Sequence, residues 1–263
     1  MRDTLTTPMA IIEADLEALQ QAMSLSPVFQ TTHEPDAILY WSHLPLPAGN
    51  VITHARISAR DVPTRVPALL GPYLERGLPF RWVTTPKTTT PALEATLAQA
   101  GMVPRENPAM HLALQETVDP GTPDDVYIDV AWPDHLEPVS SILFSGFGLP
   151  RGTEAEHLQF LDTLDPADTQ FFIARSLVTG EPLGASTMHR RGTSVMLANV
   201  STSEHARGRG VAKALCATML NRAAHTEART ATVLANDEGY QVYVDLGFRT
   251  KFNVVTWEWH PQT

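Results

Sequence analysis

The chain has 263 residues, which at roughly 150 residues per domain suits one large domain or two modest ones. Hydrophobic residues make up 43% and charged residues 18%, and the 15 glycines and 21 prolines are too few for a disordered chain. The formal net charge of −10 argues against a general nucleic-acid binder, because an acidic surface repels phosphate backbones.

The first half of the chain is predicted to alternate helices with short strands. Its first helix is indicated by apolar residues at helical spacing (Ile12, Leu16, Leu19 and Met23) behind a proline suited to the first turn. In chain order we expect a helix, two strands, a helix, a strand, a helix and a strand: Pro8–Leu25, Ala37–Ser42, Val51–Ile57, Val62–Arg76, Phe80–Thr84, Pro91–Ala100 and Ala109–Leu114.

A linker rich in turn-forming residues, Val118–Asp125, is the best candidate for a domain boundary. We divide the chain there into a domain of residues 1–120 and a domain of residues 121–263. After the linker we expect a strand, two helices, three antiparallel strands, and then a helix, a strand, a helix and a strand: Val126–Val130, Leu136–Phe147, Glu154–Leu164, Phe171–Arg175, Leu183–Arg190, Val195–Thr202, Gly210–Ala224, Thr230–Ala235, Glu238–Leu246 and Asn253–Trp259.

Both halves end in a helix, a glycine and a strand. Gly101-Met102 precedes the last predicted strand of the first half, and Gly247-Phe248 precedes the last one of the second half. A diverged internal duplication explains this match. The general preference for glycine after a helix, where the backbone turns left-handed, explains it equally well.

The segment Val200–Ala212 predicts a phosphate-binding loop, because a strand ends there, two glycines follow and a helix begins. Gly208 and Gly210 let the backbone approach a ligand, and the helix adds unpaired first-turn amides and its positive dipole end. A P-loop is excluded because Val211 and Ala212 stand where Lys and Ser or Thr are needed. A dinucleotide fingerprint is excluded because position 213 is a lysine, not a small residue. The plainer alternative is a surface loop that caps a helix.

The spacing Arg-x-x-Gly-x-Ala in Arg207–Ala212 resembles the pyrophosphate loop of the GCN5-related N-acetyltransferases, the GNAT family. Asn236, Tyr243 and Leu246–Phe248 then follow in the order and at the intervals of the second half of that family's coenzyme A site. The resemblance extends over about residues 126–259 and is specific over residues 195–248. It implies an α+β fold with a mixed, mostly antiparallel sheet, flanking helices and a V-shaped splay between two parallel strands.

The resemblance also implies acetyl-coenzyme A as co-substrate and assigns residues to it. Backbone groups of two strand residues would pair with the pantetheine arm, the loop amides would hold the pyrophosphate, and an asparagine would hydrogen-bond the pantetheine chain. The residues concerned are Val200, Thr202, Arg207, Gly208, Arg209, Gly210, Val211, Ala212 and Asn236. Tyr243 would be the general acid on the leaving thiolate, which suits a phenol with a pKa near 10. A core aromatic residue is the alternative.

The general base is harder to assign. Some family members use a carboxylate on the splayed strand, and here Val195–Val200 contains none. Glu204 and His189 are subsidiary candidates, and each has a plainer interpretation as a solvated loop residue or a satisfied histidine. We therefore expect a chain of ordered water molecules to carry the proton.

Other catalytic chemistries find no support in the sequence. The single cysteine, Cys216, excludes an internal disulfide and a cysteine-based zinc site, and it is expected to be a buried apolar residue. The chain lacks a Gly-x-Ser-x-Gly elbow and the His-Glu-x-x-His spacing of a metal helix. No metal is expected.

The implied function is an N-acetyltransferase that moves an acetyl group from acetyl-coenzyme A to a primary amine of a small molecule or peptide, by direct attack in a ternary complex. The alternatives are a non-catalytic module that binds coenzyme A, which the missing strand carboxylate favours, and a scaffold for protein interactions. Residues 1–120 lack the glycine loop and are expected to be a shortened, degenerate copy of the domain. A structural cap or an unrelated α+β domain is the alternative.

The expected location is the cytoplasm. No stretch reaches the 18 or so apolar residues that a membrane span needs, and the polar segment Met1–Pro8 does not resemble a signal peptide. We expect no nucleic-acid or membrane partner and a monomer or homodimer. The sequence leaves the acceptor amine and the size of the acyl group open.

Overall fold

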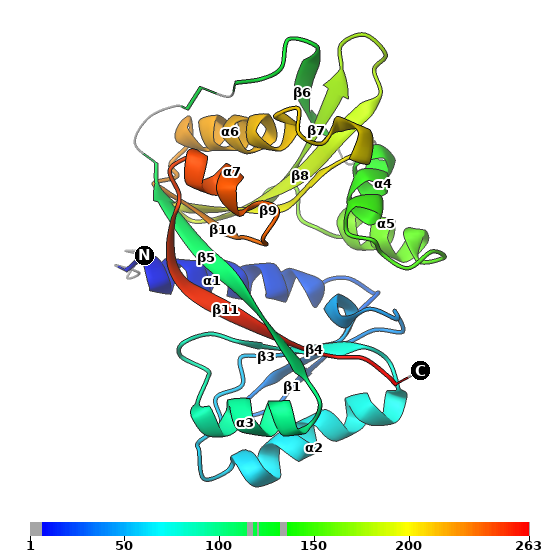
Figure 1. Cartoon of the computed structure of the whole chain (residues 1–263), viewed down its shortest axis with the longest axis vertical. Coiled ribbons are helices and arrows are strands. Elements are labelled where there is room, and N and C mark those ends of the chain that lie inside the picture. Colours follow the sequence, from blue (N-terminus) through cyan, green and yellow to red (C-terminus); the bar gives the residue numbers. More distant parts are fainter. Residues whose placement is uncertain (1–6, 115–117, 120, 132–135, 263) are drawn as a thin grey trace. The chain divides into compact units, whose positions relative to one another are not determined.

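The computed structural model describes residues 7–114, 118–119, 121–131 and 136–262, and they form two compact units (Figure 1). Unit 1 comprises the described residues of Met1–Ala22 and Pro108–Lys251, and unit 2 those of Met23–Asn107 and Phe252–Thr263. This division differs from the expected boundary after residue 120, because the chain passes between the units after residues 22, 107 and 251. Pro120 itself lies outside the described residues.

The sheet of unit 1 has the strand order β5-β10-β9-β8-β7-β6. Its strands are β5 (Val103–Ala113), β6 (Val126–Ala131), β7 (Thr169–Ser176), β8 (Pro182–Arg191), β9 (Ser194–Thr202) and β10 (Thr230–Leu234). Neighbouring strands are antiparallel except β9 and β10, which are parallel. The predicted mixed, mostly antiparallel sheet is therefore confirmed.

Helices cover both faces of this sheet (Figure 1). They are α1 (Pro8–Met23), α4 (Leu136–Gly146), α5 (Glu154–Asp162), α6 (Val211–Ala224) and α7 (Tyr240–Asp245). Along β7, Phe172 and Ala174 share an apolar cluster with α6, whereas Phe171 and Ile173 share one with α4 and α5. Successive side chains of a strand point to opposite faces, so a strand covered on both sides is apolar throughout.

The sheet of unit 2 has the strand order β1-β2-β3-β4-β11-β5. Besides β5, its elements are β1 (Gln30–His33), β2 (Ile38–Trp41), β3 (Val51–Thr53), α2 (Val62–Arg76), β4 (Phe80–Thr84), α3 (Pro91–Gln99) and β11 (Arg249–Trp259). The helices α2 and α3 contact each other and bury one cluster with Trp82 and Trp257, which are cross-strand neighbours on β4 and β11.

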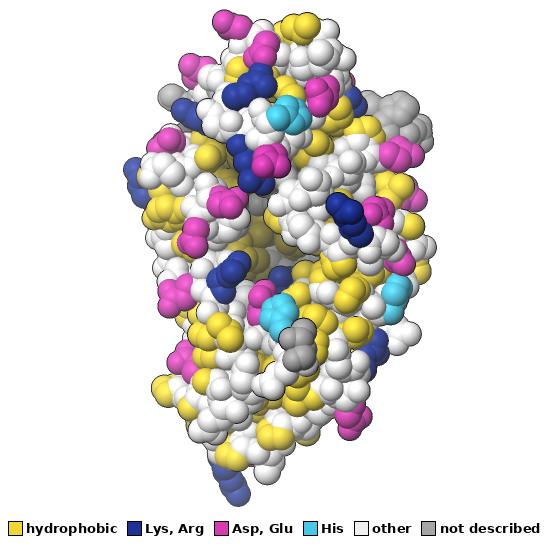
Figure 2. Space-filling model, turned by 45° about the vertical axis from the view of Figure 1, so that its right-hand side comes forward, with side chains coloured by type: hydrophobic (Ala, Val, Ile, Leu, Met, Phe, Trp, Pro, Cys, Tyr) yellow, Lys and Arg dark blue, Asp and Glu magenta, His cyan; other side chains and the backbone are white. Residues whose placement is uncertain are grey.

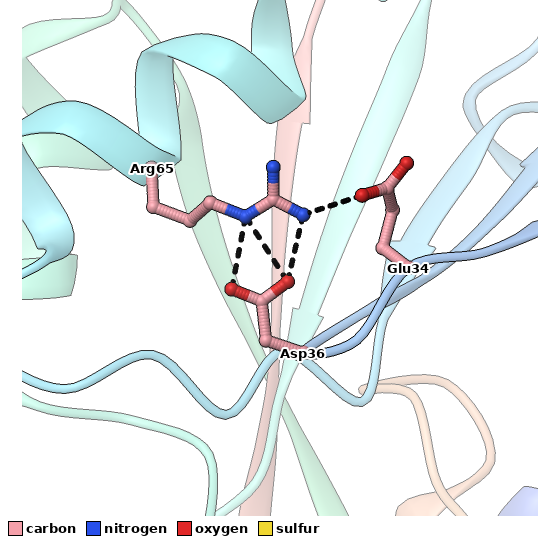
Figure 3. A network of polar contacts seen from close by, with 3 residues as sticks. All are labelled: Glu34, Asp36 and Arg65. Carbon is pink, nitrogen blue, oxygen red and sulfur yellow. Dashed lines mark hydrogen bonds and ion pairs between the residues drawn. The ribbon is translucent and has the colours of Figure 1, made fainter.

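A charged network ties α2 to the turn between β1 and β2 (Figure 3). Arg65 Nε donates to both carboxylate oxygens of Asp36, at 3.1 and 2.9 Å, and Arg65 Nη2 donates to Asp36 Oδ1 at 2.8 Å and to Glu34 Oε2 at 2.7 Å. The guanidinium lowers the pKa of the Asp36 carboxyl, and the two carboxylates raise the pKa of Arg65.

Four strands differ clearly from the sequence prediction. β1 was not predicted, because Gln30–His33 is polar and mostly exposed and has no apolar alternation. β3 ends at Thr53 instead of Ile57, since His54 adopts a positive φ of 56°. β5 begins at Val103 instead of Ala109, across a proline-containing and polar stretch. β11 begins at Arg249 instead of Asn253.

The matching helix ends of the two halves are present in the structure. Gly101 and Gly247 have φ of 79° and 94°. In both places the following amide reaches back into the helix, from Met102 N to Leu97 O at 3.1 Å and from Phe248 N to Tyr243 O at 3.0 Å. This is the pattern of a Schellman cap, which either explanation of the repeat accommodates.

Candidate functional site

The parallel strands β9 and β10 stay paired over only part of their length. Pairing runs from Ser194 opposite Thr230 to Leu197 opposite Val233, and β9 then continues to Thr202. A bulge in the β8–β9 pair follows the last β10 contact, and Asn199 takes a positive φ of 51° there. The predicted splay between these strands is thus visible in their pairing.

The freed part of β9 presents an open hydrogen-bonding edge. Ser203 N donates to Leu183 O of β8 at 2.9 Å. Since bonding direction alternates along an antiparallel strand, the backbone groups of Thr202 and Val200 point away from β8, to the side that β10 has left. The Thr202 hydroxyl is buried and makes no hydrogen bond within the described part of the chain.

A loop with two left-handed glycines connects β9 to α6. A short 3-10 helix, η3 (Glu204–Ala206), comes first, then Gly208 and Gly210 adopt φ of 73° and 83°, and α6 begins at Val211. The amides from Gly208 to Lys213 donate to no atom among the residues described. Consecutive free amides at a helix N-terminus form an anion-binding cradle.

A glycine on β8 brings this helix end close to the strand. A β-carbon at Gly184 would lie 2.9 Å from both Ser201 O and Val211 Cγ1 and 3.1 Å from Leu215 Cδ1. The first turns of α6 therefore pack directly on β8 at Gly184, beside Ser201 of β9. Sequence analysis missed Gly184, although a glycine inside a predicted strand signals a close backbone approach.

The two arginines of the loop differ in their partners. Arg209 Nη2 forms an ion pair with Asp125 Oδ2, so part of its charge is neutralised. Arg207 is exposed and has no ion pair among the described residues. Its guanidinium is the positive charge that the loop leaves available for an anion.

Asn236 and Tyr243 meet at a glycine that the sequence analysis did not single out. Gly239 N donates to Asn236 Oδ1 at 2.8 Å, which holds the turn before α7. A β-carbon at Gly239 would lie 3.0 Å from Asn236 Oδ1 and 3.1 Å from Tyr243 Cε2. The side chains predicted to bind pantetheine and to donate the proton therefore lie against one residue.

Tyr243 is buried, and Phe248 contacts its ring edge-on with centroids 5.9 Å apart. Burial, with a smaller contribution from Cys216, raises the pKa of the Tyr243 phenol, so the hydroxyl keeps its proton. Cys216 on α6 is fully buried, as predicted, and burial raises the pKa of its thiol to about 12.

The structure separates the two subsidiary base candidates. Glu204 is exposed beyond the end of β9, whereas His189 on β8 faces Met196 near the other end of β9. The Nδ1 of His189 lies 2.9 Å from Thr169 Oγ1, and its Nε2 lies 3.3 Å from Thr187 Oγ1. Burial lowers the pKa of His189 to about 4. His189 is a neutral imidazole with both nitrogens engaged.

A carboxylate reaches β9 from the far end of the sequence. Asp15 on α1 is buried, and its Oδ2 accepts hydrogen bonds from Ser194 at 2.6 Å and Thr232 at 2.7 Å. Its Oδ1 accepts from Arg191 Nε at 2.8 Å. No local sequence signal identifies this contact, because the partners lie more than 170 positions away.

Two kinds of feature are absent from the described residues, a metal-binding cluster and a membrane-spanning helix. No group of three or more His, Cys, Asp or Glu side chains in them is placed to hold a metal ion. None of the described helices has the length and apolar character needed to cross a bilayer.

Comparisons with known proteins bear on the same region. The model of the acetyltransferase (GNAT) family matches residues 136–248, and no curated protein sequence matches the chain. Among solved structures, the chain is similar to a GCN5-related N-acetyltransferase from Kribbella flavida, with a TM-score of 0.70, 17% identity, and coverage of 99% of this chain and 98% of that one. It is also similar to one from Sphaerobacter thermophilus (TM-score 0.64, 15% identity, 87% and 81% covered). A tandem GNAT protein from the clavulanic acid biosynthesis pathway gives a TM-score of 0.59 at 12% identity, with 95% and 96% covered. At sequence identities this low, the similarity to these structures shows a shared fold and no more.

Proposed function

Residues 136–248 belong to the GNAT family of acetyltransferases, and on this premise we propose that the chain transfers an acetyl group from acetyl-coenzyme A to a primary amine. The amine belongs to a small molecule or a peptide and attacks directly in a ternary complex. The observation that carries this proposal is the run of free amides from Gly208 to Lys213 beside the open edge of β9.

The chemistry of this region suits acetyl-coenzyme A. The amides of Gly208–Ala212 and the unpaired charge of Arg207 would hold the pyrophosphate, as expected for a helix N-terminus with a flanking cation. Arg209 would contribute less, because Asp125 shares its charge.

The pantetheine arm would add to β9 as a strand adds to a sheet edge. The outward backbone groups of Val200 and Thr202 would pair with it, and the unsatisfied Thr202 hydroxyl gives the buried edge a further polar group that needs a partner. Asn236 would donate from its amide nitrogen, since its oxygen accepts from Gly239.

Tyr243 would protonate the departing thiolate. Its raised pKa keeps the hydroxyl protonated at the alkaline pH where amines are free bases. A general acid needs that state when the carbon–sulfur bond breaks.

The acceptor is proposed to be a cationic amine in solution. The formal net charge is −10, and Figure 2 shows acidic side chains scattered among Lys and Arg over the displayed face. A negative molecule attracts ammonium groups and raises their local concentration.

The test is calorimetric titration with acetyl-coenzyme A, followed by thiol release over an aminoglycoside, free amino acids, polyamines and short peptides. Gly208→Glu and Gly210→Glu should each weaken binding by roughly a hundredfold, because a carboxylate placed in the cradle repels the pyrophosphate. Gly180→Glu is the matched control: Gly180 has φ of 74° against 73° for Gly208, and a β-carbon at either position meets no atom within 4 Å.

Unchanged affinity in both loop variants would refute the cradle. Tight binding without thiol release from any amine would identify a module that only binds coenzyme A and would refute the proposed transfer.

A further inference from the structure

His111 lies on β5 in the row of residues that ends at the strand splay. It stands directly opposite Thr232 of β10, and Thr232 stands opposite Met196 of β9. The next residue of β10, Val233, makes the last contact with β9. His111 therefore lies on β5, the strand beside β10. It is level with Thr232, one residue before the last pair between β10 and β9.

The side chain of His111 lies on the sheet face opposite α6. Its neighbour Met110 packs in the α6 cluster, as do Ala231 and Val233 on either side of Thr232. Because side chains alternate between faces, His111 and Thr232 share the other face. The hydroxyl of Thr232 donates to Asp15 at 2.7 Å on that face.

The imidazole has an unused nitrogen. His111 Nε2 is buried and forms no hydrogen bond with any described residue. A buried polar atom without a partner is rare in folded proteins and marks a place where a ligand or a water molecule completes the bonding. With the proton on Nδ1, Nε2 presents a free electron pair.

Charges near His111 come from three elements, β11, α1 and β8. Burial and, to a smaller extent, Lys251 on β11 lower the pKa of His111, and Asp15 on α1 acts in the opposite direction. Arg191 of β8 shares the charge of Asp15 through its ion pair. The net effect lowers the pKa of His111 from its ordinary value, which favours the neutral imidazole.

We propose that His111 is the general base that deprotonates the acceptor amine, which gives the acetyl transfer proposed above its missing proton acceptor. The ammonium loses one proton to Nε2, and the freed electron pair forms the bond to the carbonyl carbon while the carbon–sulfur bond breaks. The sulfur leaves with that bonding pair and takes a proton from Tyr243. The phenolate recovers the second amine proton, and His111 releases its own to solvent.

This assignment resolves the problem that β9 contains no carboxylate. His189 has both nitrogens engaged by threonines, and Asp15 has both oxygens occupied by donors. His111 is the neutral imidazole near the splay with a nitrogen left over.

The test compares His111→Gln with His225→Gln, a change at the exposed end of α6, using the amine from the panel that gives the fastest thiol release. His111→Gln should lower kcat by roughly a hundredfold or more and leave the dissociation constant of acetyl-coenzyme A unchanged. The kcat of the unmodified protein should fall with acid as His111 protonates, at a lower pH than an ordinary histidine would give, because its pKa is lowered. The variant should lack this step, and added imidazole should restore part of the rate to His111→Ala.

Three results would overturn the assignment: an unchanged kcat in His111→Gln, the same acid limb in both proteins, or weakened acetyl-coenzyme A binding that accounts for the loss. If any of these results is obtained while the unmodified protein still releases thiol with an amine, only the role of His111 is refuted and the proposed acetyl transfer stands. An unmodified protein that binds acetyl-coenzyme A but releases thiol with no amine refutes that function, and the role of His111 with it.

Discussion

Asp15 and Tyr243 are both buried polar side chains with opposite surroundings. Donors occupy both oxygens of Asp15, whereas the Tyr243 hydroxyl forms no hydrogen bond with the described residues. A satisfied buried carboxylate fixes structure, and an unsatisfied hydroxyl is free to meet a substrate. The two residues should therefore respond differently to conservative substitution.

At Tyr243 we expect a loss of turnover with little loss of binding. Tyr243→Phe keeps the ring contact with Phe248 and removes only the proton donor, so kcat should fall by roughly a hundredfold. Acetyl-coenzyme A affinity, measured by calorimetry, should change less than twofold (about 0.4 kcal/mol). Tyr240→Phe, on the exposed side of the same helix, is the control. Equal kcat in the two variants would remove the proposed role.

At Asp15 we expect a loss of stability. Asp15→Asn removes the negative charge that pairs with Arg191. It also places an amide NH2 group, which is a donor, against one of the three groups that donate to the carboxylate in the unmodified protein. Removing one partner of a buried ion pair costs about 3 kcal/mol. Urea unfolding followed by circular dichroism measures the change. Glu17→Gln, at an exposed position of the same helix, should stay within about 0.5 kcal/mol. Equal effects of the two variants would contradict this account.

Sequence reasoning located individual residues where the signal is local. Gly208 and Gly210 take the left-handed backbone that their spacing implies, and Cys216 is buried as expected. Asp15 and His111 were not singled out from the sequence, because their contacts join elements that lie far apart along the chain. The roles assigned to the loop residues, Asn236 and Tyr243 remain predictions.

Two helical glycines offer a test at the level of elements. A β-carbon at Gly146 on α4 would lie 1.7 Å from Ser201 Oγ and 2.9 Å from Ser201 Cβ, whereas one at Gly71 on α2 would meet nothing within 4 Å. Gly146→Ala should destabilise the protein by roughly 1–3 kcal/mol because α4 and β9 must separate. Gly71→Ala should stabilise it by about 0.5–1 kcal/mol.

Gly146→Ala should also weaken acetyl-coenzyme A binding, since Ser201 stands between the two residues proposed to pair with pantetheine. Thermal unfolding and calorimetry measure the two effects. A stability gain in Gly146→Ala, or a loss in Gly71→Ala, would contradict the close packing at Gly146 and the open space at Gly71.

The network that joins α2 to the β1–β2 turn should make unit 2 sensitive to acid. Because Arg65 lowers the pKa of Asp36 from 3.8, the pair contributes stability above that pH and loses it as pH falls through the lower folded value. Arg65→Met should cost about 1–2 kcal/mol at neutral pH, and this difference should shrink below pH 4 or so.

Tryptophan fluorescence can follow unfolding in that experiment, since Trp41, Trp82, Trp257 and Trp259 belong to unit 2. Arg60→Met, at an exposed position before α2, is the control. A difference between Arg65→Met and the unmodified protein that is independent of pH would contradict the lowered pKa of Asp36.

Elements with strong patterns were predicted well, and those without were not. The apolar face of α2 (Val62, Val66, Leu69, Leu70 and Tyr73) is buried as its spacing implies, even though Pro67 and Pro72 lie inside the helix. β1 and the first part of β5 carry polar residues or prolines. Their pairing comes from neighbouring strands, which a single sequence does not reveal.

For the whole molecule, the division into units predicts how fragments behave. A cut between residues 120 and 121 removes α1 and β5 from the rest of unit 1 and removes the end of β11 from the rest of unit 2. Neither fragment should give a cooperative thermal transition alone, because each lacks strands that its core needs. Mixing the two fragments should restore cooperative unfolding. Cooperative unfolding of either fragment alone would contradict this division.

The passage of the chain between the units could not be predicted from the sequence. Residues 118–125 carry the strongest turn signals, and turn signals mark where a chain bends, not which strands it joins. The membership of α1 and of the end of β11 depends on contacts with residues far along the chain, such as those of Asp15 with Ser194 and of Val255 with Thr84.

Because the chain crosses between the two units three times, each unit can be completed only late in synthesis on the ribosome. α1 emerges first, yet its partner Ser194 is translated about 180 residues later, which takes roughly ten seconds or more. In the same way, β4 cannot pair with its partner strand β11 until β11 has been synthesised. Both units therefore remain incomplete until the last strand leaves the exit tunnel, and their apolar faces stay exposed until then. Cells that express this protein should rely on chaperones that hold nascent chains.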